Sequence, residues 1–166
     1  GFAAACVNDK WGVINSEGTE LTSFEYGWIG SFYNGYAEAG IQNKAGFISA
    51  NGDFHNIDYD YICNFNENGL AAVCKNYKWG FINAKGEEVI PCIYDQIDSD
   101  DAVPNRAWDA PGMHMALGEF YDGLTRVEKD GKWGFVDANG NEVIPLIYDY
   151  VGNFKDGAAK AEKDGF

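Results

Sequence analysis

Long apolar runs and clusters of basic residues are both missing from this chain of 166 residues. No apolar run approaches the ~18 residues that a transmembrane helix needs, so insertion into a membrane is not expected. Lys and Arg number 12 against 26 Asp and Glu, and the net charge is −14. Because so negative a surface repels phosphate backbones, binding to nucleic acid is not expected either. The acid excess fits solubility, or the attraction of cations or a basic partner.

Residues typical of metal and redox chemistry are also scarce. The four Cys and two His have neither Cys-x-x-Cys nor His-rich spacing, so no structural zinc, other metal or cofactor is expected. Asp98, Asp100 and Asp101 suggest calcium, but the Gly and the terminal Glu of a calcium-binding loop are missing. The cysteines are expected to be buried or half-buried free thiols. Alternatively, Cys63 and Cys74 could face one another across adjacent strands.

A helical period is absent as well, so helix is expected to be nearly absent. Apolar residues instead come in short runs rich in Val, Ile, Phe, Tyr and Trp, and each run is broken by Gly, Asn or Asp. These runs predict strands at 124–129, 132–137 and 141–145, followed by an irregular piece at 148–154. Pro91 and Pro145 cannot donate to a ladder, so they mark where third strands end or lie on an edge.

What the chain does have is one pattern repeated. The pair Trp-Gly begins at Trp11, Trp79 and Trp133, and Ala45-Gly46 takes its place once. The spacing is 34 residues (45 − 11 and 79 − 45), and then 54, which is 34 plus an insertion of 20. The predicted repeats are 1–34, 35–68, 69–122 with the insertion at 99–118, 123–156, and a partial repeat at 157–166. A fixed period of this size indicates an array of small supersecondary units.

The third and fourth repeats share a longer motif: KWGF, a turn ending in Gly, then EVIP and Tyr-Asp. These residues resemble the WG-repeat family of bacterial proteins, and the resemblance covers nearly the whole chain. The first repeat departs from the motif at Leu21-Thr22-Ser23. The second repeat carries Phe54-His55 in place of Glu-Val and has one extra residue after Phe65. The resemblance implies a β-rich repeat with binding roles and supplies no catalytic residues.

The predicted fold is all-β, with about four antiparallel β-meander repeats. One repeat is too small to be stable alone, so neighbours are expected to share a core. Trp11, Trp79 and Trp133 are expected to pack there or between repeats, with sugar stacking on their rings as the alternative. The Gly after each Trp would let a neighbouring backbone approach closely. Three good strands per repeat and a surplus first strand favour an open solenoid-like stack over a closed small propeller.

The insertion at 99–118 is the one segment outside the repeat. Long excursions from a repeat scaffold often carry binding, and this one combines Trp, Arg and Met with proline. The alternative is a self-packed loop that covers an exposed join between repeats. The candidate ligand-binding residues are Arg106, Trp108, Met113, His114 and Met115.

Catalysis is not expected, because no motif ties a Ser or Cys nucleophile to His114. His55 is interpreted as local divergence in the second repeat rather than as a ligand. We therefore expect a non-catalytic binding or scaffold module of a larger bacterial protein. The sequence does not determine its compartment, although it favours the cell surface or secretion. Its expected ligand is a protein or peptide, bound through the insertion. The alternatives are carbohydrate or cell-wall binding through aromatic clefts between repeats, and a purely structural spacer.

Overall fold

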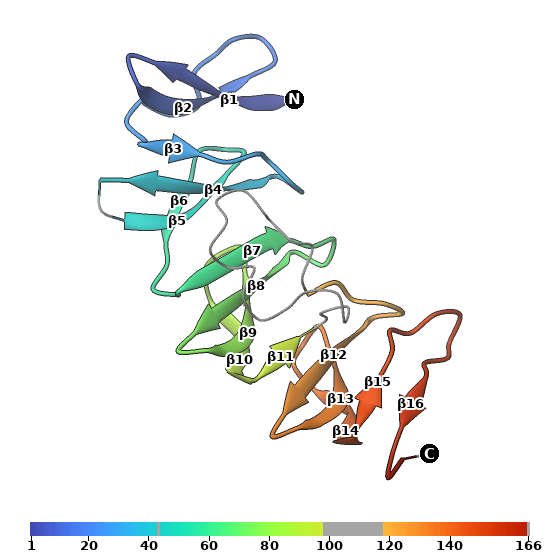
Figure 1. The fold of residues 1–166 in the computed structure, drawn as a ribbon. Helices are drawn as coiled ribbons and strands as arrows, with labels where there is room; N and C mark the ends of the chain where they lie inside the picture. Colours follow the sequence, from blue (N-terminus) through green and yellow to red (C-terminus); the bar gives the residue numbers. More distant parts are fainter. Residues whose placement is uncertain (43, 98–117, 166) are drawn as a thin grey trace. The chain divides into compact units, whose positions relative to one another are not determined.

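The computed structural model describes residues 1–42, 44–97 and 118–165. Within them the chain forms sixteen β-strands and no helix (Figure 1). The chain divides into two compact units, Gly1–Asp58 and Tyr59–Phe166. The expected fold class is confirmed: the repeats are antiparallel, and none of the sheets described closes into a barrel. No helix long and apolar enough to cross a membrane occurs in the described ranges.

The first unit contains a hairpin and a four-stranded sheet. The hairpin pairs β1 with β2, and the sheet has the order β3-β4-β5-β6. Its core includes the fully buried side chains of Val13 and Ile48, with Tyr26 and Ile29 beside them. The strands of this unit are β1 (Phe2–Val7), β2 (Lys10–Asn15), β3 (Trp28–Ile29), β4 (Tyr36–Ile41), β5 (Lys44–Ser49) and β6 (Phe54–Asn56).

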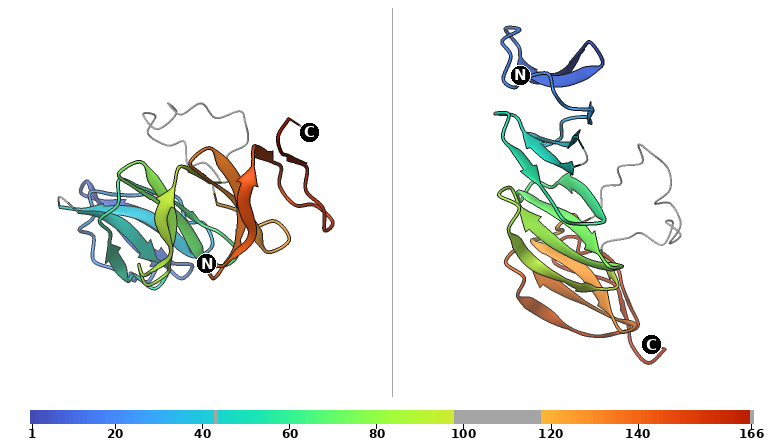
Figure 2. Two further views of the ribbon diagram at one scale, coloured as in Figure 1. Left: turned by 90° about the horizontal axis from the view of Figure 1, so that it is seen from below. Right: turned by 90° about the vertical axis from the view of Figure 1, so that its left-hand side faces the viewer.

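The second unit contains two four-stranded sheets, in the orders β10-β9-β8-β7 and β11-β12-β13-β14, and a short pair, β15-β16. Figure 2 shows the two larger sheets of this unit lying one over the other. The strands are β7 (Tyr61–Phe65), β8 (Leu70–Lys75), β9 (Lys78–Asn83), β10 (Glu88–Tyr94), β11 (Gln96–Ile97), β12 (Leu124–Lys129), β13 (Lys132–Asp137), β14 (Glu142–Tyr148), β15 (Tyr150–Val151) and β16 (Ala161–Glu162).

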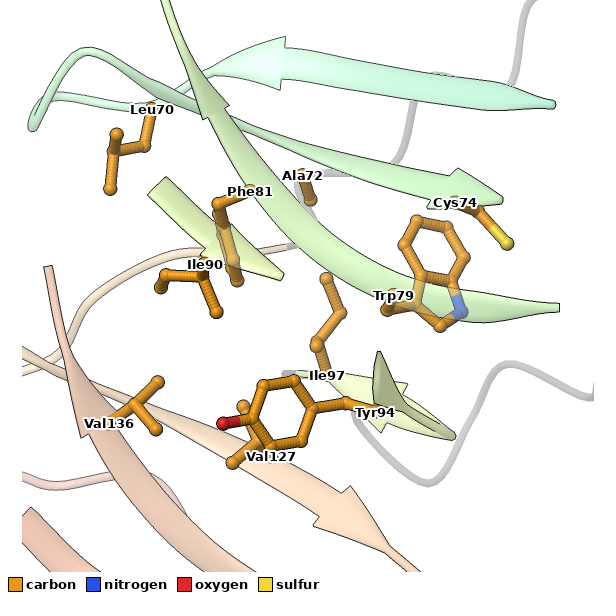
Figure 3. Close-up of a cluster of buried hydrophobic side chains, with 10 residues drawn as sticks. All are labelled: Leu70, Ala72, Cys74, Trp79, Phe81, Ile90, Tyr94, Ile97, Val127 and Val136. Atoms are coloured by element: carbon orange, nitrogen blue, oxygen red, sulfur yellow. The ribbon is translucent and has the colours of Figure 1, made fainter. Parts of the chain in front are cut away.

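The core of the second unit lies between its two larger sheets. Phe81 and Ile90 of the first sheet and Val127 and Val136 of the second are all completely buried. Figure 3 shows Tyr94 reaching from the end of β10 toward the two valines. The two repeats therefore share one apolar layer, as expected for units too small to fold alone.

Each repeat also lends a strand to the sheet of the next repeat. The short strand β11 belongs by sequence to the third repeat, but it pairs with β12 of the fourth, with Ile97 opposite Val127. In the same way β3 pairs with β4, and β15 pairs with β16. The irregular piece expected at 148–154 thus contains β15, whose partner lies in the following repeat.

The Gly of the Trp-Gly pair lies under the third strand of its repeat. A Cβ atom built on Gly80 would lie 2.4 Å from the carbonyl oxygen of Ile90, and one on Gly134 would lie 2.5 Å from that of Ile144. Contacts this short do not occur for real Cβ atoms. The close backbone approach expected from sequence is therefore confirmed, and it explains why Gly follows Trp.

The third strands run further than the sequence predicted. The expected strand 141–145 is instead β14, which continues past Pro145 to Tyr148. Phe135 faces Ile144 and Trp133 faces Tyr148, so the register shifts and the residues around Pro145 bulge. Because β14 is an edge strand, the missing N–H of proline removes no ladder hydrogen bond. The prediction of an end at Pro145 was wrong, and the edge position was right.

The turn between the second and third strands uses one side chain in the same way in each repeat. Asn83 Oδ1 accepts hydrogen bonds from the backbone N–H groups of Lys85 and Glu87, at 2.9 and 3.0 Å. Asp137 does the same two and four residues ahead. These are Asx turns, in which a side chain replaces a backbone partner.

Candidate functional site

The residues predicted to bind ligand lie outside the described residues, as do Asp98, Asp100 and Asp101 of the calcium alternative. The predicted binding residues are Arg106, Trp108, Met113, His114 and Met115. The structure describes the two points at which the insertion leaves and rejoins the repeat. These points, Ile97 and Gly118, set the geometry of the candidate site.

On the N-terminal side, the chain leaves the repeat from the core. Ile97 is the last residue of β11 and is only 2% exposed. It pairs with Val127 and packs in the cluster that also holds Phe81 and Ile90. The start of the insertion is therefore held by both a strand ladder and apolar packing.

On the C-terminal side, the chain returns at a buried glycine. Gly118 has a φ of +83°, and a Cβ atom there would lie 2.5 Å from Cε1 of Phe81 and 3.0 Å from Cβ of Ala72. Both the backbone angle and the space therefore require Gly. Phe120 then packs edge-on against Phe81, with ring centroids 5.5 Å apart.

Asn66 fixes that return point by hydrogen bonding. Its Nδ2 donates to the carbonyl oxygen of Gly118 at 2.8 Å. Its Oδ1 accepts from the N–H groups of Asn68 and Leu70, so the orientation of the amide is set. Sequence reasoning missed Asn66, although the one-residue excess after Phe65 was the signal that marked this place.

Two carboxylates lie beside this point. Burial raises the pKa of Glu119 above its ordinary value, and the negative charge of Glu67 raises it further. The base of the insertion therefore carries local negative potential at the place where it meets the core. Such a potential favours cationic over anionic groups in anything that approaches.

Tyr77 is a second feature that the sequence reasoning missed. It occupies the second turn position of the β8–β9 hairpin, with a φ of +62°, and its side chain is 92% exposed. The corresponding position is Asp9 in the first repeat and Gly131 in the fourth, both suited to positive φ. An aromatic residue in this conformation is strained and also exposes apolar surface. The signal was an aromatic residue between two turn-forming positions of the repeat.

The three repeat tryptophans differ in their surroundings. Trp79 is 7% exposed and lies in the core of the second unit, as expected. Trp11 is partly buried against the core of the first unit. Trp133 is also partly buried, and the guanidinium of the buried Arg126 lies 5.6 Å from its ring centroid. Arg126 Nη1 donates to the carbonyl oxygen of Val151 at 2.9 Å.

The cysteines are all free thiols. Cys74 is buried, and Cys63 and Cys92 are half-buried, but Cys6 is exposed, so the expectation of four covered thiols was wrong at Cys6. Tyr61, not Cys63, is the partner of Cys74 in the ladder, and the alternative of a facing pair was also wrong. Burial, followed by the charge of Glu88, raises the pKa of Cys92 to about 11.

The remaining histidine stacks on an aromatic ring. His55 in β6 lies parallel to Phe47 in β5, with ring centroids 4.8 Å apart and an angle of 13°. Within the ranges that the structure describes, no group of three or more His, Cys, Asp or Glu side chains could hold a metal ion. His55 thus contributes to packing in the first unit.

A protein-family model described as "WG containing repeat" matches the chain in five stretches: residues 11–44, 46–79, 79–101, 116–133 and 133–165. Comparisons with curated proteins and with solved structures gave no significant match.

Proposed function

Since this chain belongs to the WG containing repeat family, we propose that it is a non-catalytic binding module whose ligand is a protein or peptide. In this proposal the repeats form the scaffold, and the insertion at 99–118 makes the contact. The insertion holds the binding residues proposed from sequence, Arg106, Trp108, Met113, His114 and Met115.

The observation that carries the proposal is the way the insertion is attached. Ile97 and Gly118 are both buried in the second unit, and Phe81 packs near each of them. A contact segment whose ends are fixed by a packed core can be varied without unfolding the scaffold that holds it. This is the arrangement expected of a binding loop on a repeat frame.

The composition of the insertion supports a protein ligand. Trp and Arg are the residues most enriched at hot spots of protein interfaces, and Met adapts its shape to irregular partners. Trp108 and Arg106 supply the first two, while Met113 and Met115 supply the third. A net charge of −14 on the chain further favours a partner with a basic surface.

Tyr77 supports a second contact with the same class of ligand. Tyrosine provides large contact area at low entropic cost, and here it stands on a closed two-residue hairpin. Keeping an exposed aromatic residue at a strained position has a cost that a role in recognition would explain.

The carbohydrate alternative has weaker support. Stacking on a sugar needs an accessible ring face. Trp79 is buried, and one face of Trp133 lies toward the guanidinium of Arg126. The protein-binding proposal is therefore the better supported of the two.

The test is an excision that the repeat itself suggests. The excision is shifted by one residue from the bounds 99–118 so that Gly118 is kept. Removing 98–117, also 20 residues, joins Ile97 to Gly118 and gives Ile-Gly-Glu-Phe, which matches Ile29-Gly30-Ser31-Phe32 of the first repeat. We expect this variant to keep its β-sheet circular dichroism and its cooperative melting. Proteins retained by the immobilised full chain would be identified, purified and titrated against both forms by calorimetry, and we expect the affinity to be lost on excision.

Point variants separate the contact from the scaffold. Trp108→Ala should weaken binding of the purified partner without changing the melting temperature, and Tyr77→Gly should weaken it while the fold is at least as stable. Cys6→Ser, at an exposed position of the first unit, is the matched control and should change neither quantity. Unchanged affinity in the excised protein would refute the proposal, and an excised protein that does not fold would identify the insertion as structural cover.

A further inference from the structure

At three places in the second unit, an aspartate that follows a third strand accepts a hydrogen bond from the hairpin of the next repeat. We call Asp60, Asp95 and Asp149 the junction aspartates; each follows the tyrosine at or near the end of a third strand. Their Oδ2 atoms accept hydrogen bonds from the first turn residue of the next hairpin: Asn76 N–H at 2.7 Å, Asp130 N–H at 3.1 Å and Asp164 N–H at 2.7 Å.

The other carboxylate oxygen binds the lysine of the same repeat. Lys78 Nζ donates to Asp95 Oδ1, and Lys132 Nζ donates to Asp149 Oδ1. In both cases the lysine directly precedes the Trp-Gly pair. One carboxylate thus holds its own repeat with one oxygen and the following repeat with the other.

The backbone has the same geometry at four positions, three of which carry a junction aspartate. The N–H groups of Asp60, Asp95 and Asp149 each donate to a carbonyl oxygen of the following first strand at 2.8 Å. Gly27 of the first repeat makes the same bond, to Gly40, at 2.8 Å. The first repeat thus has the backbone geometry of a junction but lacks the carboxylate.

We propose that the junction aspartate is a link between consecutive repeats, and that the junction between the first and second repeats lacks this link because Gly27 stands in its place. The turn amide explains why the carboxylate matters. In a two-residue hairpin the closing residues, such as Lys129 and Lys132, pair with one another, and the amide of the first turn residue receives no partner from the ladder. The aspartate of the preceding repeat supplies that partner.

Gly27 can accept the missing side chain. A Cβ atom built there would meet only the carbonyl oxygen of Gly40, at an ordinary contact distance of 3.7 Å. Trp11 pairs with Tyr26 as Trp79 pairs with Tyr94, so Lys10 stands across from residue 27 as Lys78 stands across from Asp95. The turn amide that a carboxylate would reach is that of Gln42, which has a φ of +54°.

The decisive experiment installs the junction. In Gly27→Asp, amide hydrogen exchange at Gln42 should slow by roughly threefold to tenfold relative to Gly27→Ala, the range for one net hydrogen bond. Gly27→Ala matches the loss of backbone freedom without adding a carboxylate. Equal exchange at Gln42 in the two variants would overturn the proposal.

Removing a junction should have the opposite effect. In Asp95→Ala, exchange at Asp130 should speed up by a similar factor, while exchange at Asp164 should not change. Asp130→Asn is the control, because it removes a nearby charge, tolerates positive φ and leaves the Asp95 carboxylate in place. Unchanged exchange at Asp130 in the alanine variant would contradict the proposal. Since no binding partner is involved, the result does not depend on the proposed function.

Discussion

The carboxylate of Asp95 accepts a hydrogen bond from the backbone amide of Asp130, 35 positions later in the chain. Asp149 makes the corresponding bond to Asp164 across only 15 positions. The difference of 20 (35 − 15) is the length of the insertion, which lies between the two partners in the first case. The junction between the third and fourth repeats is therefore closed in the same way as a junction without an insertion.

Trp79→Ala should destabilise the protein by about 3–5 kcal/mol, the range for truncating a buried large aromatic residue. Trp79 is 7% exposed, whereas Trp133 is only partly buried. Trp133→Ala should therefore cost less. Denaturant unfolding of both variants checks the order, and equal losses would show that burial is not what distinguishes the two rings.

Gly80→Ala should destabilise by about 1–3 kcal/mol, because the added methyl group overlaps the backbone of β10. The Cβ atom would lie 2.4 Å from the carbonyl oxygen of Ile90 and 2.7 Å from the nitrogen of Cys92. Gly12→Ala is the matched comparison, since its nearest contacts are at 3.2 Å. Thermal melts should show the larger loss at Gly80.

Tyr77→Gly should stabilise the protein by about 0.5–1 kcal/mol, because glycine adopts positive φ without strain. The result would be an Asn-Gly turn, the preferred sequence for a two-residue hairpin. Tyr77→Ala keeps the strain of an L residue and should give no such gain. A loss of stability in the glycine variant would mean that the ring makes contacts that matter for folding.

Acid should weaken the second unit through its junction aspartates. The hydrogen bond from Lys78 lowers the pKa of Asp95 below its ordinary 3.8, and the bond from Lys132 does the same for Asp149. A group whose pKa is lower in the folded state stabilises fully above its unfolded value, and this contribution is lost as the pH falls through the folded value. The positive charge of Lys129 also lowers the pKa of Asp95. The negative charges of Asp130 and Glu128 raise the pKa of Lys78.

Unfolding free energy measured against pH should therefore be level down to about pH 5 and should fall below the ordinary pKa of 3.8. The double variant Asp95→Ala/Asp149→Ala should show a shallower fall. An unchanged acid limb in that variant would assign the pH dependence to other carboxylates, of which Asp137 is one with a lowered pKa, chiefly through its bond from Asn141.

The hairpins could be predicted from sequence because their signals are local. Turn residues such as Asp130-Gly131 fix the exact residues at which the flanking strands end and begin. The predicted strands 124–129 and 132–137 therefore match β12 and β13. The third strand was misjudged at Pro145 because proline ends a strand only where its N–H would be needed. Whether a strand lies on an edge depends on its neighbours, which a single repeat does not reveal.

The anchor of the insertion could not be predicted, because it joins residues far apart in sequence. Asn66 and Gly118 are separated by 52 positions, and Gly118 lies against Phe81 and Ala72 of two neighbouring strands. Tyr77 was visible as an exception to the turn pattern, but its 92% exposure could be read only from the structure. Local sequence patterns therefore predict the repeat scaffold, whereas the anchor of the insertion and the exposure of Tyr77 can be seen only in the three-dimensional structure.

The pairing of β11 with β12 affects how the number of repeats can change in evolution. Because each four-stranded sheet is assembled from two adjacent repeats, a single repeat copied within a gene carries a three-stranded meander and one strand for its successor. Duplication or loss of 34 residues then yields whole sheets wherever the crossover falls within the period. Recombination can therefore lengthen or shorten the array without having to respect the boundary of any sheet.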